Sequence, residues 1–272
     1  MAELTEKPAS TAEDEPGFWA RLLTPVTNAL DHLGRLLILT GQSVVWMIRP
    51  PYRFSQLLAA MEFIGVQSIF IVSLTGMFSG MVLALQLTYS LRQFGGEGLV
   101  GRLVAVSLLR EMSPVFASLM ITARAGSAMA AELGNMRVTE QIDALTTMAV
   151  SPVQYLLSPR LLGASLVAPL LCVLFSSIGM LGAWLVAVQG LGVDLGVFLS
   201  NIESGVTPAD YYMGLVKASV FGFLVCAISC CEGFYASGGA KGVGQATTRA
   251  VVQSAVAILV ANYLLTSLMT EV

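Results

Sequence analysis

Three charged side chains, Arg110, Glu111 and Lys217, lie inside segments of the sequence that are otherwise almost entirely apolar. Arg110 and Glu111 belong to the run Ser107–Pro152, which begins as an apolar helix pattern and turns polar after Arg124. A charge near the middle of a lipid bilayer costs about 2.5–3.5 kcal/mol on insertion scales, so it normally faces a partner or a cavity. These residue types at these positions predict a polar site inside a membrane.

The composition supports a membrane location. Of the 272 residues, 56% are hydrophobic and only 11% are charged, and the mean hydropathy is +0.77. Soluble domains carry about 25% charged residues, so the chain is predicted to be an integral membrane protein. The 26 glycines fit close helix packing in lipid. With a net charge of −3 and no basic tract, nucleic acid is not expected as a partner.

The predicted fold class is an all-α integral membrane protein with an N-terminal interfacial amphipathic helix, five transmembrane helices and a cytoplasmic coupling helix. Residues 1–16 are acidic, lack the apolar core of a signal peptide, and are expected to form a disordered tail. Apolar residues at helical spacing, interrupted by charges, favour an interfacial helix over residues 17–50. The remaining residues, 51–272, form the membrane domain, with spans expected at about 54–91, 99–124, 161–188, 211–235 and 250–269.

Orientation follows from the Lys and Arg residues that flank the spans. If the N-terminus is inside, ten basic residues lie on the cytoplasmic side and only two on the outer side, and five spans place the C-terminus outside. The inner set is Lys7, Arg21, Arg35, Arg49, Arg53, Arg124, Arg137, Arg160, Lys241 and Arg249, and the outer pair is Arg92 and Arg102.

This topology gives the polar residues a depth. At 1.5 Å per helical residue, Arg110 and Glu111 lie roughly 12–14 Å below the outer end of their span, and Lys217 and Asn262 roughly 10 Å below the outer ends of theirs. Arg110 and Glu111 point about 100° apart and cannot face each other. We therefore expect Glu111 to pair with Lys217, and Asn262 to lie near Arg110.

Two interpretations of this cluster remain open on the sequence alone. It could be an ion cluster that only locks the helix bundle together, or a polar girdle around a cavity for a charged or zwitterionic headgroup. A third role, Glu111 as a proton relay in a secondary transporter, is less favoured, because we expect no second carboxylate deep within a span, with Glu62 remaining at the interface near the start of the first. Gly76 and Gly80 form a GxxxG motif in the first span, which could be a packing face or a hinge.

The polar segment after the second span predicts a short helix outside the membrane, at about residues 138–149, with Arg124–Gly126 as the joint. Thr139 is the expected N-cap, with Glu140 in the first turn. Ile142, Leu145 and Met148 form an apolar stripe, and Ser151–Pro152 ends the helix. Such a helix could be a plain connector or a docking helix for a cytoplasmic partner.

Motifs for catalysis are absent from the sequence. The chain has no G-x-x-x-x-G-K-[ST] nucleotide loop, no nucleophile elbow and no H-E-x-x-H. Cys226 and Cys230 have a spacing that a metal pair could use, but with a single histidine, His32, they are interpreted as small buried helix residues. No enzyme activity, metal or cofactor is expected in this chain, so any energy from ATP must come from another chain.

The motifs SLLREMSPVFASLMITARAGSAMAAELGNMRVTEQIDAL, MAVSPVQYLLSPR and GAKGVGQATTRAVVQS, in this order, closely resemble the MlaE family. Its members are permease subunits of bacterial ABC transporters that move phospholipids between the inner and outer membranes together with MCE-domain proteins. The likeness runs from about Phe18 to the C-terminus. It implies a homodimer in the inner membrane, a separate ATPase subunit that binds ATP and Mg, a hexameric MCE protein on the outer face and an accessory STAS-domain protein.

The resemblance also implies roles for particular residues. The ATPase would dock on the helix at 138–149, which makes Glu140, Gln141 and Asp143 coupling candidates, with Arg124 and Arg137 beside them. Phospholipid would bind in an outward-open cavity at the dimer interface, lined by the first span and the buried charges. The lining residues would be Gly76, Gly80, Arg110, Glu111 and Lys217. The best known members carry an aspartate in the fifth span where this chain has Asn262, which can form a hydrogen bond but no ion pair.

Overall fold

The computed structural model describes residues 18–49 and 54–270 of the chain. Every regular element in these residues is helical, which confirms the all-α prediction. The expected acidic tail at 1–16 and most of the break at 49–53 lie outside the described residues. The helices are α1 (Phe18–Ile48), α2 (Phe54–Ile64), α3 (Ile69–Arg92), α4 (Val100–Ser107), α5 (Ser113–Ile121), α6 (Ser127–Val138), α7 (Gln141–Thr147), α8 (Ser158–Trp184), α9 (Leu195–Gly205), α10 (Pro208–Phe234) and α11 (Gly239–Thr270).

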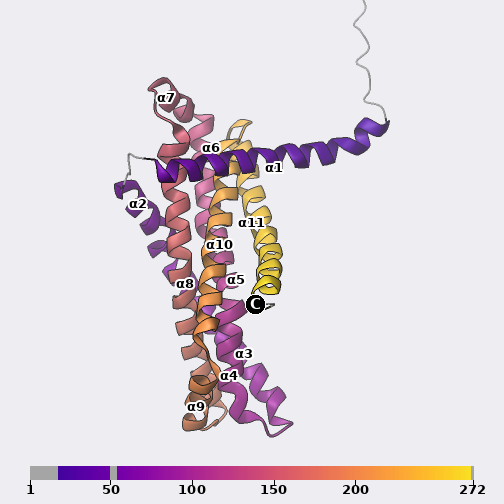
Figure 1. Cartoon of the computed structure of the whole chain (residues 1–272), viewed down its shortest axis with the longest axis vertical. Coiled ribbons are helices and arrows are strands. Elements are labelled where there is room, and N and C mark those ends of the chain that lie inside the picture. The colour runs from indigo at the N-terminus through magenta and orange to yellow at the C-terminus, as the bar shows by residue number, and fades with distance from the viewer. Residues whose placement is uncertain (1–17, 50–53, 271–272) are drawn as a thin grey trace, which may run out of the picture.

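Five helical stretches in the described residues are long and apolar enough to cross a membrane, as predicted. They are Phe54–Arg92, Glu97–Val138, Val153–Gly190, Pro208–Phe234 and Gly239–Met269. They run alternately up and down one elongated bundle, with α7 at one end and α9 at the other (Figure 1). Helix α1 lies across the α7 end, roughly perpendicular to the spans, as an interfacial helix would (Figure 1).

The second span is longer than the sequence indicated, because the helix does not end near Arg124. It passes through π-helical turns at Leu108–Met112 and Thr122–Gly126 and continues as α6 to Val138. The prediction ended the helix near Arg124 because the residues of α6 are polar. In the structure these residues remain helical, and Glu132 accepts a hydrogen bond from Arg160 on a neighbouring helix at 2.8 Å. The expected joint at Arg124–Gly126 is therefore a widened turn inside one continuous helix.

Helix α9 was also not predicted. It lies in the polar connection between the third and fourth spans, and its first turn is capped by Asp194, whose carboxylate accepts the Val197 N–H at 2.9 Å.

Glycines bring the helices of the bundle close together. Gly80 on α3 lies against Gly179 on α8 so closely that a Cβ added at Gly80 would stand 1.8 Å from the Gly179 carbonyl oxygen. Gly76, one turn earlier on α3, lies against the Phe175 backbone in the same way. Helix α10 packs between α8 and α11, so the middle of the bundle is built by α8, α10 and the second span.

Helix α11 stands at the edge of the bundle. Its buried positions recur every fourth residue and form one narrow stripe, made of Gly242, Ala246, Ala250, Ser254 and Ile258. Its other described side chains are exposed or half-buried, which leaves most of its surface to lipid or to a partner. It ends before reaching the α9 end of the bundle (Figure 1).

Candidate functional site

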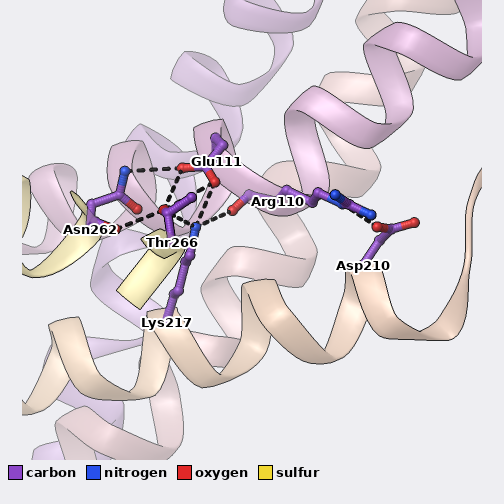
Figure 2. A network of polar contacts seen from close by, with 6 residues as sticks. All are labelled: Arg110, Glu111, Asp210, Lys217, Asn262 and Thr266. Atoms are coloured by element: carbon purple, nitrogen blue, oxygen red, sulfur yellow. Dashed lines mark hydrogen bonds and ion pairs between the residues drawn. The ribbon is translucent and has the colours of Figure 1, made fainter. Parts of the chain in front are cut away.

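Lys217 stands at the centre of the polar cluster. Its side chain is 0% exposed, and its ammonium group uses all three of its hydrogens on oxygen acceptors. Nζ donates to Glu111 Oε1 at 2.7 Å, to Thr266 Oγ1 at 2.8 Å and to the Arg110 carbonyl oxygen at 3.1 Å. Figure 2 shows these contacts joining the second span to α10 and α11.

Pro114 explains why the Arg110 carbonyl is free to accept this bond. A proline has no N–H, so it cannot donate to the carbonyl four residues earlier, which is that of Arg110. The π-helical turn Leu108–Met112 lies directly before it. The helix therefore lacks one of its usual internal hydrogen bonds at the carbonyl to which the Lys217 ammonium donates.

Glu111 forms the other half of the ion pair and has further partners on α11. Its Oε2 accepts the Asn262 side-chain amide at 3.0 Å, and Thr266 Oγ1 lies 3.3 Å from Oε1. The predicted pairing of Glu111 with Lys217 is therefore present in the structure. The predicted position of Asn262 beside Arg110 is wrong, because Asn262 donates to Glu111 whereas Arg110 points toward Asp210 (Figure 2).

Arg110 pairs with Asp210 at the start of α10 (Figure 2). The buried Asp210 also closes a capping box, since its Oδ2 accepts the Thr207 N–H at 2.7 Å and the Thr207 hydroxyl at 2.9 Å. Asp210 lies one residue before the predicted fourth span at 211–235, so the sequence pattern did not place it beside Arg110. The pattern Thr207-Pro208-Ala209-Asp210 is a helix-start signal that could have placed it on the first turn of the span.

The network balances two cations against two carboxylates. Arg110 and Glu111 keep 41% and 40% of their side chains exposed, whereas Lys217 and Asp210 are buried. Asn262 Oδ1 is buried and has no hydrogen-bond partner among the described residues. The site therefore offers one accessible cation and one accessible anion, an arrangement that suits a zwitterionic group.

Cavities lie beside this network. One of about 350 Å³ is bordered by Arg110 and Asp210 together with Tyr212, Met213 and Met269. A larger, mainly apolar cavity of about 570 Å³ lies between the second span, α8, α9 and α10, and is lined by side chains such as Trp184, Phe198 and Leu215. Its volume lies within the about 300–1,000 Å³ typical of small-molecule sites.

Gly76 and Gly80, which the resemblance assigns to a lipid cavity between two protomers, are packing residues within this protomer. Gly76 and Gly80 are buried on the face of α3 that packs on α8, as described above. Neither lines the 570 Å³ cavity. The opposite face of α3 carries an exposed apolar row that includes Phe70, Leu74 and Phe78.

At the other end of the bundle, the predicted coupling helix is α7. Its N-cap is Glu140, not Thr139, because Glu140 adopts a left-handed backbone with φ of 59° while the Thr139 hydroxyl donates back to the Asn135 carbonyl at 2.8 Å. Arg137 donates to Asp143 at 2.6 Å, which ties α7 to the end of α6.

The surface of α7 is mostly exposed. Glu140, Gln141, Asp143 and Met148 face solvent, while Ile142 is buried. Arg124 lies away from α7, where it donates to the Phe63 carbonyl and to Gln67 at the junction of α2 and α3. The structure thus groups Glu140, Gln141, Asp143 and Arg137 and separates Arg124 from them.

Five apolar spans, three of which carry a balanced ion network, and a charged helix at one end define a multi-span membrane protein. The sequence model of the family described as Permease MlaE matches residues 57–268, and the chain belongs to this family of ABC transporter permeases.

Relatives in other organisms agree with this assignment. The chain is 42% identical over 240 residues to a probable ABC transporter permease protein of Rickettsia bellii, covering 88% of this chain and 93% of that protein. It is 41% identical over 217 residues to the intermembrane phospholipid transport system permease protein MlaE of Haemophilus influenzae, covering 79% and 83%. It is 32% identical over 267 residues to the chloroplast protein TRIGALACTOSYLDIACYLGLYCEROL 1 of Arabidopsis thaliana, covering 97% and 76%.

Proposed function

We propose that this ABC transporter permease moves phospholipids between the inner membrane and an MCE-domain protein, with ATP hydrolysed by a separate subunit. The observation that carries the proposal is the ion network, in which a buried Lys217 and a buried Asp210 hold Glu111 and Arg110 with their charges partly accessible. The name of the relative from Haemophilus influenzae, an intermembrane phospholipid transport permease, supports the same cargo.

The chemistry of the network fits a phospholipid headgroup. Arg110 offers a guanidinium that suits a phosphate, and Glu111 offers a carboxylate that suits an ammonium group. The apolar surfaces around these two groups suit acyl chains. A small hydrophilic solute would need a continuous polar path, whereas the walls of the 570 Å³ cavity are mainly apolar.

The ATPase subunit is proposed to dock on α7. Its exposed acidic residues, Glu140 and Asp143, project from the end of the bundle, and the ion pair of Asp143 with Arg137 connects them to the second span. Since α6 is the last part of the same continuous helix that carries Glu111, a push on α7 would reach the ion network along that helix.

Two copies of the chain are proposed to form the transporter. The exposed apolar row of α3 and the largely unburied α11 are the apolar surfaces that a second protomer would cover. With the N-terminus in the cytoplasm, α9 and the ion network lie toward the periplasm, where a hexameric MCE protein would receive or deliver lipid. An accessory STAS-domain protein would bind the ATPase.

Purification from the native membrane in mild detergent tests the proposal, with mass spectrometry of the subunits and lipids that remain bound. We expect an ATPase, an MCE protein and phospholipid in the preparation. Robust transport without an ATPase would instead indicate an ion-coupled or small-solute transporter. Undiminished function after loss of the buried charges would indicate a membrane anchor for the MCE protein.

A further inference from the structure

A second buried carboxylate lies at the α1 end of the bundle, far from the ion network. Glu232, near the end of α10, is 4% exposed, and its two oxygens accept hydrogen bonds from two different helices. Nε2 of His32, on α1, lies 2.5 Å from Oε1, and Nε of Arg249, on α11, donates to Oε2 at 2.8 Å. Three helices therefore meet at one side chain.

Arg35 adds a further cation to this junction. It lies one turn after His32 on the same face of α1, and its guanidinium stands over the Tyr235 ring, 5.6 Å from the centroid. Arg35 forms no ion pair with any carboxylate in the part of the chain that the structure describes. With Arg35 and Arg249 against Glu232, the junction has a net positive charge in either protonation state of His32.

These side chains line one small cleft of about 110 Å³, which also contacts Cys231. The cleft remains accessible, because half of the Arg249 side chain is exposed and Arg35 is exposed. Its two guanidinium groups are the donors that bind phosphate oxygens best, since each presents several N–H groups in one plane. The aromatic ring beside them supplies an apolar wall.

The position of the cleft indicates where such a phosphate would come from. Helix α1 lies across the end of the bundle (Figure 1), and exposed Leu30, Leu33, Leu37 and Ile38 give it an apolar surface. A helix of this kind lies at the boundary between headgroups and acyl chains. The cleft on α1 therefore lies at the level of lipid headgroups, where basic pockets between membrane helices bind anionic lipids.

We propose that this cleft, lined by Arg35, Arg249 and His32, binds the phosphate of an anionic membrane lipid. Phosphatidylglycerol is the simplest such lipid, and in the proposed orientation it would come from the cytoplasmic leaflet. The bound lipid would bridge α1 to α10 and α11, holding the interfacial helix against the bundle. This site is distinct from the transport path and does not depend on the cargo or on ATP.

Binding is tested with the full-length protein in nanodiscs, by native mass spectrometry and thermal unfolding, with phosphatidylglycerol titrated into phosphatidylcholine. The wild-type protein should retain phosphatidylglycerol preferentially and unfold at a higher temperature in its presence. Arg35→Gln should bind it about tenfold more weakly, since a charge-assisted contact is lost. Arg35→Lys should retain part of the affinity.

Arg92→Gln is the matched control. Arg92 is an exposed arginine at the opposite end of the bundle, paired with Glu97, and its loss should leave phosphatidylglycerol binding unchanged. Equal melting temperatures of Arg35→Gln and the wild type in pure phosphatidylcholine would show that the fold is intact. Wild-type affinity in Arg35→Gln would overturn the proposal. Protection by inorganic phosphate, without any preference for phosphatidylglycerol over phosphatidylcholine, would overturn the lipid as the source.

Discussion

The Lys217 ammonium lies 2.7 Å from the Glu111 carboxylate and 3.1 Å from the backbone carbonyl oxygen of Arg110, the residue that precedes Glu111. One buried cation therefore ties α10 both to a side chain and to the backbone of the second span. The backbone contact exists because Pro114 leaves that carbonyl without its usual helical donor.

Replacing Lys217 by Met should destabilise the protein, because Glu111 would lose its cation in a low-dielectric site. Breaking a buried pair from one side costs about 3–5 kcal/mol, and the partial exposure of Glu111 places the expected loss near the lower figure. The double variant Glu111→Gln with Lys217→Met should recover much of that loss. Thermal unfolding of both variants in detergent gives the coupling energy, and strictly additive losses would contradict the pairing.

Asp210→Ala should cost more stability than Asp194→Ala, although both side chains accept a backbone N–H at the start of a helix. Removing an N-cap costs about 1 kcal/mol, and this is the whole effect expected at Asp194. At Asp210 the change also removes the partner of Arg110, which adds roughly the 1.5–3 kcal/mol of a charge-assisted hydrogen bond. Unfolding curves of the two variants should differ accordingly; equal losses would mean that the ion pair contributes nothing.

Gly80→Ala should separate α3 from α8, because the new Cβ would stand 1.8 Å from the Gly179 carbonyl oxygen, an overlap that only backbone movement relieves. Gly244→Ala is the control, since nothing lies within 4 Å of a Cβ at that position on α11. There, alanine should add up to about 1 kcal/mol through its better helix propensity. Expression level and melting temperature report both outcomes, and a fully stable Gly80→Ala would contradict the packing.

Glu140→Gly should raise stability slightly, because Glu140 holds φ at 59°, where glycine has no steric penalty. We expect a gain of up to about 1 kcal/mol in the free energy of unfolding, measured by thermal unfolding.

Glu140→Lys with Asp143→Lys should abolish co-purification of the ATPase while the permease stays in the membrane. An intact complex in the charge-reversed variant would remove α7 from the coupling mechanism.

The span pattern could be predicted from the sequence because long apolar runs and basic flanks report the lipid environment directly. The pairing of Glu111 with Lys217 followed from depth, since two unlike charges at one level of a membrane have few alternatives. Helix ends were harder to place. The helix continues past Arg124 because its polar residues find partners on neighbouring helices, as Glu132 does with Arg160.

The partners of Arg110 and Asn262 could not be predicted in this way. Depth alone gives no direction around a helix axis, and the π-helical turn Leu108–Met112 changes the angular position of every residue after it. The contact of α1 with Glu232 was equally out of reach, because His32 and Glu232 are 200 residues apart in the sequence. Such contacts depend on tertiary packing.

The most direct test of the central claim is transfer of a labelled phospholipid from liposomes that contain the permease with its ATPase to an acceptor MCE protein. The account predicts transfer that requires ATP in the wild-type complex. It also predicts at least about a tenfold loss in the double variant Glu111→Gln with Lys217→Met, while that complex still assembles. Undiminished ATP-driven transfer by the assembled variant, or no ATP-dependent transfer by the wild type, would contradict the account.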